Sequence, residues 1–169
     1  MSALDKVDRV AGRALRIVGL FAFLAPLLAR GVIGQAFYYT GKAKLANPPV
    51  EFFSSLGIPF PEANAVFVAH LEHYGGMLLI AGLATRLVAL LLSSTMVVAI
   101  LTAHREEVWN AARGIGESTL VDLAAVAYLT IVVWLVFFGA GVVSLDALVL
   151  RAYRRWRGLP TGMEPASQA

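Results

Sequence analysis

The sequence contains no cysteine and comparatively little charge. Because none of the 169 residues is cysteine, the chain cannot form disulfides, thiol redox centres or cysteine-ligated zinc and iron–sulfur sites. Charged residues make up 15% of the chain and hydrophobic residues 59%, whereas ordinary soluble domains have about 25% and about 45–50%. Mean hydropathy is +0.73. This composition predicts a membrane protein, and the length suits one domain.

The chain also lacks the motifs of several enzyme classes. It contains no phosphate-binding loop, no nucleophile elbow, no candidate catalytic triad and no internal repeat. The net charge of +3 could suggest a nucleic acid partner, but most basic residues lie beside apolar segments. Anionic lipid head groups explain them more simply. We therefore expect a lipid bilayer as the partner and no nucleic acid.

The first residues predict an amphipathic helix over residues 4–23. Apolar residues recur at helical spacing while charged residues fill the other face. Such a helix would lie in the head-group layer as an extension of residues 1–19. A signal peptide is the alternative, since a basic start precedes an apolar run, although no small-x-small cleavage site follows.

Four apolar segments predict an all-α membrane protein built as a four-helix transmembrane bundle. The bundle domain covers residues 20–145, and a basic tail of residues 146–169 follows it, with a disordered end. The expected spans are residues 20–41, 63–84, 87–103 and about 119–143. The third is short, and the fourth starts at a capping-box pattern formed by Thr119 and Asp122. Residues 42–61 predict an apolar loop that packs on the membrane surface or over the bundle mouth, and residues 104–118 a polar connection.

Lysine and arginine counts predict the orientation of these spans. Nine basic residues fall on one side: Lys6, Arg9, Arg13, Arg16, Arg86, Arg151, Arg154, Arg155 and Arg157. Four fall on the other: Lys42, Lys44, Arg105 and Arg113. We therefore expect a multi-pass protein of the inner, cytoplasmic membrane with both termini in the cytoplasm.

Glu72 is the main candidate for chemistry. It lies within the second apolar segment, where an unpaired charge would be costly. Small residues one turn away, Ala69, Gly75 and Gly76, would let another helix approach closely. Arg30 lies well inside the first segment and is the expected counter-ion at a similar depth. The pair could be purely structural, or it could handle protons or bind a ligand, in which case Glu72 and Arg30 are the catalytic candidates.

His70 and His73 flank Glu72 on the same predicted helix. They could share a metal or donate hydrogen bonds to a quinone carbonyl, although H-x-E-H is not the zinc motif H-E-x-x-H. A bis-histidine haem would need a second histidine on another helix at matching depth, and His104, the remaining histidine of the sequence, falls at the outer end of the third segment. A histidine satisfied by a neighbouring carbonyl is the simpler interpretation, so we expect no metal.

Three further polar residues lie at membrane boundaries and are candidates for ligand binding. They are Lys44, Arg86 and His104. The alternative for each is interfacial anchoring, with the charged end reaching the head-group layer. Arg86 could also pair with Asp146 or cap the second helix.

Several of these residues fall into one pattern. Arg30-x3-Gly34 is followed by Gly41-Lys42-Ala43-Lys44-Leu45, then Leu56-Gly57-Ile58-Pro59, and then by the segment LEHYGGMLLIAGLATR over residues 71–86. Over residues 27–145 the chain resembles the DoxX family of small membrane proteins, whose central signature is LExxGGxxLxxGLxTR. Arg30, Lys44, Glu72, Arg86 and His104 match polar positions of that family. His70 and His73 do not belong to the pattern.

The resemblance implies a four-helix membrane bundle and a link to respiratory redox chemistry. The leading hypothesis is an accessory, quinone-linked subunit of a membrane oxidoreductase, with no covalently bound cofactor and with membrane-associated protein partners. Two alternatives stay open: a non-enzymatic scaffold or assembly subunit, and a small transporter. The protein could also form a homo-oligomer.

Overall fold

The computed structural model describes residues 12, 16 and 19–159, and this part of the chain is all-helical. Most of the predicted amphipathic extension and the end of the predicted tail lie outside these residues. The helices are α2 (Leu24–Ala46), α3 (Val50–Ser55), α4 (Pro61–Ala81), α5 (Thr85–Thr102), α6 (Arg105–Ala112), α7 (Ala124–Phe138) and α8 (Leu145–Trp156).

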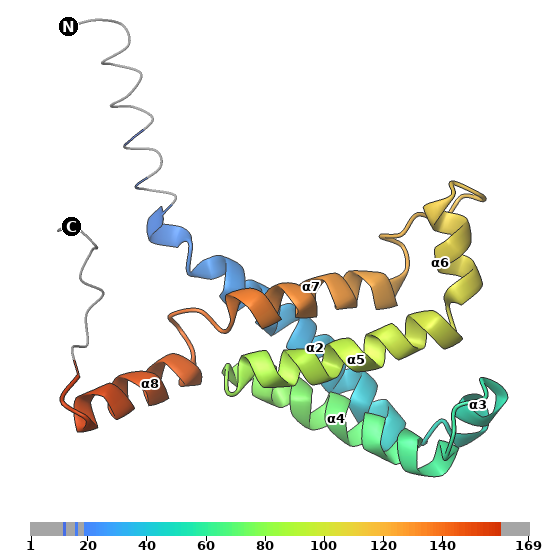
Figure 1. The fold of residues 1–169 in the computed structure, drawn as a ribbon, viewed down its shortest axis with the longest axis horizontal. Helices are drawn as coiled ribbons and strands as arrows, with labels where there is room; N and C mark the ends of the chain where they lie inside the picture. The colour runs from blue at the N-terminus through green and yellow to red at the C-terminus, as the bar shows by residue number, and fades with distance from the viewer. Residues whose placement is uncertain (1–11, 13–15, 17–18, 160–169) are drawn as a thin grey trace, which may run out of the picture.

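Four long helices form the body of the structure. Helix α2 packs on α4 and α7, and α5 packs on the same two helices from the other side (Figure 1). The short helices α3 and α6 lie at one end of this group, while α8 extends from the opposite end (Figure 1). The α4–α5 connection, Gly82–Ala84, is three residues long, so these two helices form a tight hairpin.

Two helices are long and apolar enough to cross a membrane. Within the described residues they are the segment Gly19–Ala46, which contains α2 and a turn at residues 22–23, and Thr85–Thr102, which is α5. Helix α7 is apolar but has 15 residues, which is about 22 Å of helix at 1.5 Å per residue. The four predicted spans thus correspond to four packed helices, and two of them meet the criterion for a span.

The boundaries of three predicted elements differ in the structure. Helix α2 continues to Ala46 instead of ending near 41, and α3 forms within the predicted loop 42–61. The Thr119–Asp122 pattern does not cap a helix: Asp122 accepts hydrogen bonds from the backbone and hydroxyl of Thr119 in a turn. Helix α7 begins later, with Leu123 at its N-cap.

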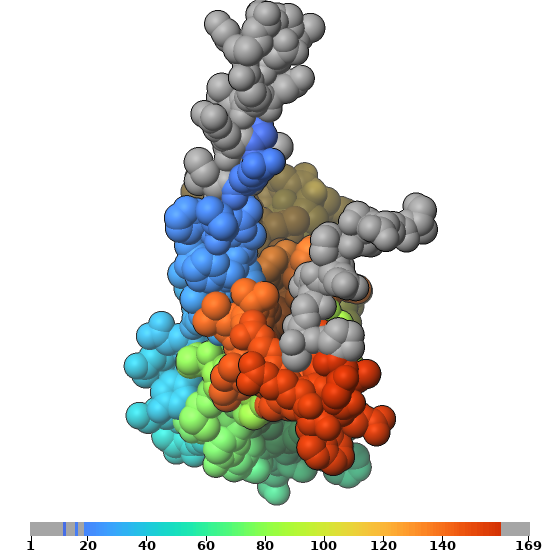
Figure 2. Space-filling model, turned by 90° about the vertical axis from the view of Figure 1, so that its left-hand side faces the viewer, coloured from blue at the N-terminus to red at the C-terminus, as the bar shows by residue number. Residues whose placement is uncertain are grey.

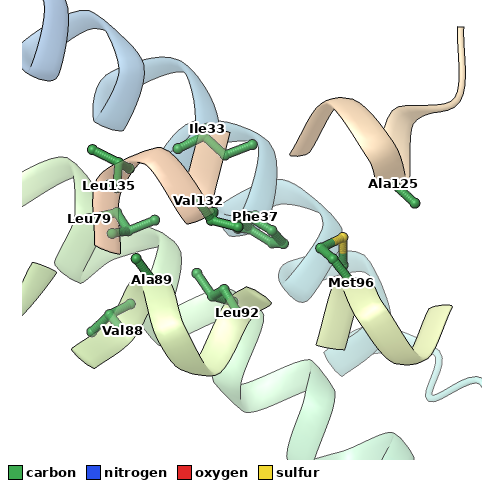
Figure 3. Packing of buried hydrophobic residues seen from close by; sticks show 10 residues of the cluster. All are labelled: Ile33, Phe37, Leu79, Val88, Ala89, Leu92, Met96, Ala125, Val132 and Leu135. Atoms are coloured by element: carbon green, nitrogen blue, oxygen red, sulfur yellow. The ribbon is translucent and has the colours of Figure 1, made fainter. Parts of the chain in front are cut away.

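The apolar core joins side chains from all four long helices. Phe37 of α2 lies fully buried at its centre and meets the ring of Tyr128 edge to face, with centroids 5.6 Å apart. The buried cluster, shown in Figure 3, consists of Ile33, Phe37, Leu79, Val88, Ala89, Leu92, Met96, Ala125, Val132 and Leu135. Many outward-facing side chains of the same helices are also apolar, including Leu28, Phe67, Leu90 and Phe137. A surface of this kind fits contact with lipid.

Glycines allow α2 and α4 to pack closely. A Cβ atom on Gly34 would lie 2.9 Å from the carbonyl oxygen of Gly76, and one on Gly41 would overlap the backbone of Glu72 and His73. Gly75 faces the other way, toward Val88 and Leu92 of α5. The predicted stripe of small residues therefore does bring neighbouring helices together. It places the backbone of Glu72 directly against α2.

Candidate functional site

Glu72 is the sole buried carboxylate among the described residues. It lies near the middle of α4 with 1% of its surface exposed, in agreement with the sequence prediction that it points into the protein. Both carboxylate oxygens accept hydrogen bonds from α2. Lys44 Nζ donates to Oε1 at 2.5 Å, and Thr40 Oγ1 donates to Oε2 at 3.0 Å. The carboxylate thus has a counter-ion, and each of its two oxygens has a hydrogen-bond partner on α2, as burial of a charge requires.

The predicted ion pair between Glu72 and Arg30 is wrong, because Lys44 is the partner. Thr40 and Lys44 are one turn apart on α2, so both reach the same face of α4. Arg30 precedes Thr40 by ten residues, which is about 15 Å along the helix axis. The prediction failed because it ended the first helix near residue 41. With that end, Arg30 would lie near the middle of the span, at the same depth in the membrane as Glu72; the helix in fact continues to Ala46.

Arg30 instead holds the connection between α7 and α8. Its guanidinium donates to the carbonyl oxygen of Ala140 at 2.9 Å and to that of Val143. The side chain lies against Gly82, where a Cβ atom would overlap the guanidinium. Arg30 is 3% exposed, so these carbonyl oxygens serve as its acceptors in place of water. Its role in the structure is to fix the 139–144 segment against α2 and the α4–α5 turn.

A cavity opens beside the Lys44–Glu72 pair. Its volume is about 400 Å³, and it is not fully enclosed. Its wall is mainly apolar and aromatic, with Phe37, Phe52, Phe53, Phe67 and Tyr128 among the lining residues. Its polar lining includes Thr40, Lys44, Glu72, Asn64 and His104. The apolar segment 42–61, expected on the membrane surface or over the bundle mouth, contributes Phe52 and Phe53 of α3 to this wall, which agrees with the second of these positions.

The structure brings together three of the seven predicted site residues, Lys44, Glu72 and His104. The imidazole Nδ1 of His104 lies 2.8 Å from Glu107 Oε2 on the exposed side of the cavity wall. In the sequence, Lys44 and His104 are two separate residues at membrane boundaries. The packing of α2 and α5, which both end beside the same cavity, brings them together. Sequence analysis did not identify Thr40; the four-residue spacing from Thr40 to Lys44 on one helix was the available signal.

His70 and His73 lie outside the cavity. His70 is exposed, and its Nδ1 donates to the carbonyl oxygen of Val66 on its own helix at 2.8 Å. His73 stacks on Tyr38, with ring centroids 4.8 Å apart, and its Nδ1 lies 3.4 Å from the Tyr38 carbonyl oxygen. Each histidine thus has a backbone carbonyl as its partner. No three histidine or acidic residues gather into a metal-binding group within the described part of the chain.

Arg86 lies at the opposite end of the molecule from the cavity. It donates to the carbonyl oxygen of Phe137 at 3.2 Å. The predicted pairing with Asp146 does not form; Asp146 instead accepts from the backbone N–H groups of Ala84 and Thr85 at 2.7 and 2.9 Å. Asp146 therefore supplies the hydrogen bonds that the start of α5 needs.

The cavity and the Lys44–Glu72 pair together suit the binding of a small apolar molecule. The ammonium group of Lys44 keeps some contact with solvent, since 31% of its side chain is exposed, whereas Glu72 is sealed behind it. A flat apolar molecule would find aromatic walls and, beside them, polar side chains that include the ammonium group of Lys44, whose position the ion pair with Glu72 fixes. Proton exchange with water would pass through Lys44 and the cavity opening. The arrangement suits binding of an apolar ligand that carries a hydrogen-bond acceptor.

Comparison with known proteins identifies one matching family model. The model described as DoxX matches residues 25–105. The protein named "Putative oxidoreductase CatD" from Bacillus subtilis (strain 168) is 36% identical over 81 residues, which are 47% of this chain. The aligned region spans 59% of that relative's length. No solved structure matches this chain. The matched region includes Lys44, Glu72 and His104, and ends before α7 and α8.

Proposed function

Residues 25–105 belong to the DoxX family, and from this premise we propose that the protein is an accessory membrane subunit of a quinone-linked oxidoreductase system. In this proposal α2, α4, α5 and α7 cross the cytoplasmic membrane as a four-helix bundle with both chain ends in the cytoplasm. The asymmetry of lysine and arginine supports the orientation. The name of the Bacillus subtilis relative, which describes an oxidoreductase, supports the redox assignment.

The observation that carries the proposal is the Lys44–Glu72 pair beside an apolar, aromatic-lined cavity. A quinone ring is flat and apolar and has two carbonyl oxygens that accept hydrogen bonds. Small-molecule sites commonly have volumes of about 300–1,000 Å³ with few, well-placed polar groups. The cavity of about 400 Å³ fits the ring of such a ligand. Lys44 would donate to one carbonyl oxygen while it also donates to Glu72.

In this proposal the Lys44–Glu72 pair supplies a proton to the quinone, and a partner protein supplies the electrons. Reduction of a quinone to a quinol takes up two electrons and two protons. We assign the electrons to a redox partner of the flavoprotein class, docked at the membrane. Lys44 would release one proton to the nearer ring oxygen as negative charge develops there, and the other ring oxygen would take the second proton from water at the cavity opening. The Lys44–Glu72 pair would be reprotonated from the same water. His104 lines the same cavity and lies on its exposed side.

Quinone binding to single-residue variants tests this proposal. The full chain, purified in mild detergent, is dialysed to equilibrium against a short-chain quinone, and bound quinone is extracted and counted. Lys44→Met and Glu72→Gln should each weaken binding at least tenfold, since a hydrogen bond to a charged group contributes about 1.5–3 kcal/mol. Lys42→Met is the matched control, because Lys42 is exposed on the same helix and does not line the cavity.

Two outcomes would contradict the quinone site. Both variants could bind as tightly as the natural chain, or Lys42→Met could lose as much affinity as Lys44→Met. Either result would leave the ion pair a purely structural feature, and a scaffold or assembly subunit would become the better interpretation.

A further inference from the structure

A second cleft lies at the other end of the molecule, between the start of α5, the end of α7 and α8. Its volume is about 680 Å³. Figure 2 looks toward this end, with α8 in red in the foreground. The cleft is separate from the cavity at Glu72 and shares none of its lining residues. It therefore requires its own explanation.

The cleft concentrates positive charge. Arg86 of α5 and Arg151 and Arg154 of α8 line it. None of the three lies within salt-bridge distance of a carboxylate in residues 19–159. The acid on the wall, Asp146, is engaged by the N–H groups of Ala84 and Thr85. Three guanidinium groups thus face one carboxylate that already has partners, and the cleft favours an anion.

Two further features of the wall match an amphiphilic anion. Thr85 lines the cleft and is fully buried, and its Oγ1 has no hydrogen-bond partner among the described residues. Leu87 and Phe138 line the cleft as well, yet they are 60% and 66% exposed. Polar groups and exposed apolar surface therefore meet in one place. A ligand with a charged head and a hydrocarbon tail would satisfy both.

Helix α8 has the character of a helix at a membrane surface. Its cleft-facing side carries Asp146, Arg151 and Arg154. Large apolar side chains are exposed elsewhere on the helix: Leu148, Val149, Tyr153 and Trp156. Helices of this pattern lie at the boundary between head groups and acyl chains. The cleft would then open at head-group depth, on the side where sequence analysis places most of the basic residues.

We propose that this cleft binds the phosphate head group of an anionic phospholipid. Arg86, Arg151 and Arg154 hold the phosphate, and the acyl chains run along the exposed apolar surface at Leu87 and Phe138. The inference does not depend on the quinone proposal, because the two sites have no residue in common. Basic clefts between helices on the cytoplasmic side are suited to anionic lipid head groups.

Native mass spectrometry of the full chain in detergent tests the site. The probes are dioleoyl-phosphatidylglycerol, which is anionic, and dioleoyl-phosphatidylcholine, which has no net charge. We expect the natural chain to retain phosphatidylglycerol about a hundredfold more strongly, since each of the three arginines contributes about fivefold. Arg151→Gln/Arg154→Gln should reduce that preference by about fivefold for each arginine, and adding Arg86→Gln should abolish it. The double variant keeps the test valid if loss of the Arg86–Phe137 contact prevents folding.

The matched control removes equal charge outside the cleft. Arg155→Gln/Arg157→Gln changes two exposed arginines at the end of α8 that do not line the cleft, and it should keep the lipid preference. Equal retention of both lipids by the natural chain would overturn the proposal, as would equal loss in the control. Displacement of phosphatidylglycerol by millimolar inorganic phosphate would also overturn it, because it would identify a free phosphate site.

Discussion

Lys44 is the ion-pair partner of Glu72 inside the protein. A carboxylate with 1% exposure loses nearly all of its hydration. The structure replaces that hydration with the ammonium group of Lys44 and the hydroxyl of Thr40. The pair sits where α2, α4 and the cavity meet, so its loss should affect stability as well as any ligand.

We expect Lys44→Met to destabilise the protein more than removal of both charges. Removing one partner of a buried ion pair lowers the free energy of unfolding by about 3–5 kcal/mol. Because the Lys44 side chain is partly exposed, we expect a loss below that range for Lys44→Met. Lys44→Met/Glu72→Met leaves no stranded charge and should recover most of the loss. Thermal unfolding of the variants in detergent, followed by circular dichroism, measures the difference. A double variant as unstable as the two single effects added together would contradict the pairing.

Asp122 provides a pH test outside the long helices. Hydrogen bonds from the Thr119 backbone N–H, and secondly from its hydroxyl, hold the pKa of Asp122 below its ordinary value. Because the folded pKa is depressed, the contribution to stability is present above the unfolded pKa, about 3.9, and is lost as pH falls through the folded pKa. Thr119→Val should raise the pKa of Asp122 only part of the way toward its ordinary value, since the backbone N–H of residue 119 still donates to the carboxylate. Carboxyl NMR titration checks this; a Thr119→Val pKa equal to that of the natural chain would contradict it.

The identity of the buried acid was predictable from sequence, but its partner was not. Glu72 within an apolar segment beside small residues indicates burial by composition alone. The partner depends on where α2 ends, because each residue moves a side chain by about 1.5 Å along the axis and 100° around it. Lysines at 42 and 44 suggested an exit from the membrane. In the structure the helix continues to Ala46, and Lys44 turns inward.

At the scale of elements, the contact between α2 and α4 positions the candidate site. Gly41 lies against the backbone of Glu72 and His73, and Gly76 lies against that of Tyr38. The distance between these two helices therefore sets whether Lys44 and Thr40 reach the carboxylate. Sequence analysis predicted the small residues of α4. It did not predict which glycines of α2 oppose them, because that register depends on the pairing of the whole helices.

Two alanine substitutions in α2 should have opposite effects. Gly41→Ala would force its Cβ into the α4 backbone, and overpacking of this kind costs about 1–3 kcal/mol. A Cβ on Gly31 meets no atom within 4 Å, so Gly31→Ala should be neutral or stabilise the helix by up to about 1 kcal/mol. Melting temperatures in detergent compare the two. If Gly31→Ala were as destabilising as Gly41→Ala, helix contact would not explain the difference.

The molecule as a whole has two chemically different ends. One end holds the apolar cavity with Lys44 and Glu72, covered by α3. The other holds the arginine-lined cleft, where Arg30 and Asp146 join α2, α5 and the α7–α8 connection. Hydrophobic periodicity predicted the helices that separate these ends. It could not predict the contacts between residues such as Asp146 and Ala84, which lie 62 positions apart in the chain and meet only through packing.

The absence of cysteine makes the arrangement across the membrane directly testable. Single cysteines at Ser54, Asn110 and Leu159 fall at exposed positions, the first in α3, the second in α6 and the third after α8. If four helices cross the membrane with both termini in the cytoplasm, a membrane-impermeant maleimide added to intact cells labels Ser54→Cys and Asn110→Cys but not Leu159→Cys. Permeabilised cells should show labelling at all three, and the cysteine-free chain at none. Labelling of Ser54→Cys without Asn110→Cys would mean that α4 and α5 do not both cross, since these two helices connect the labelled positions.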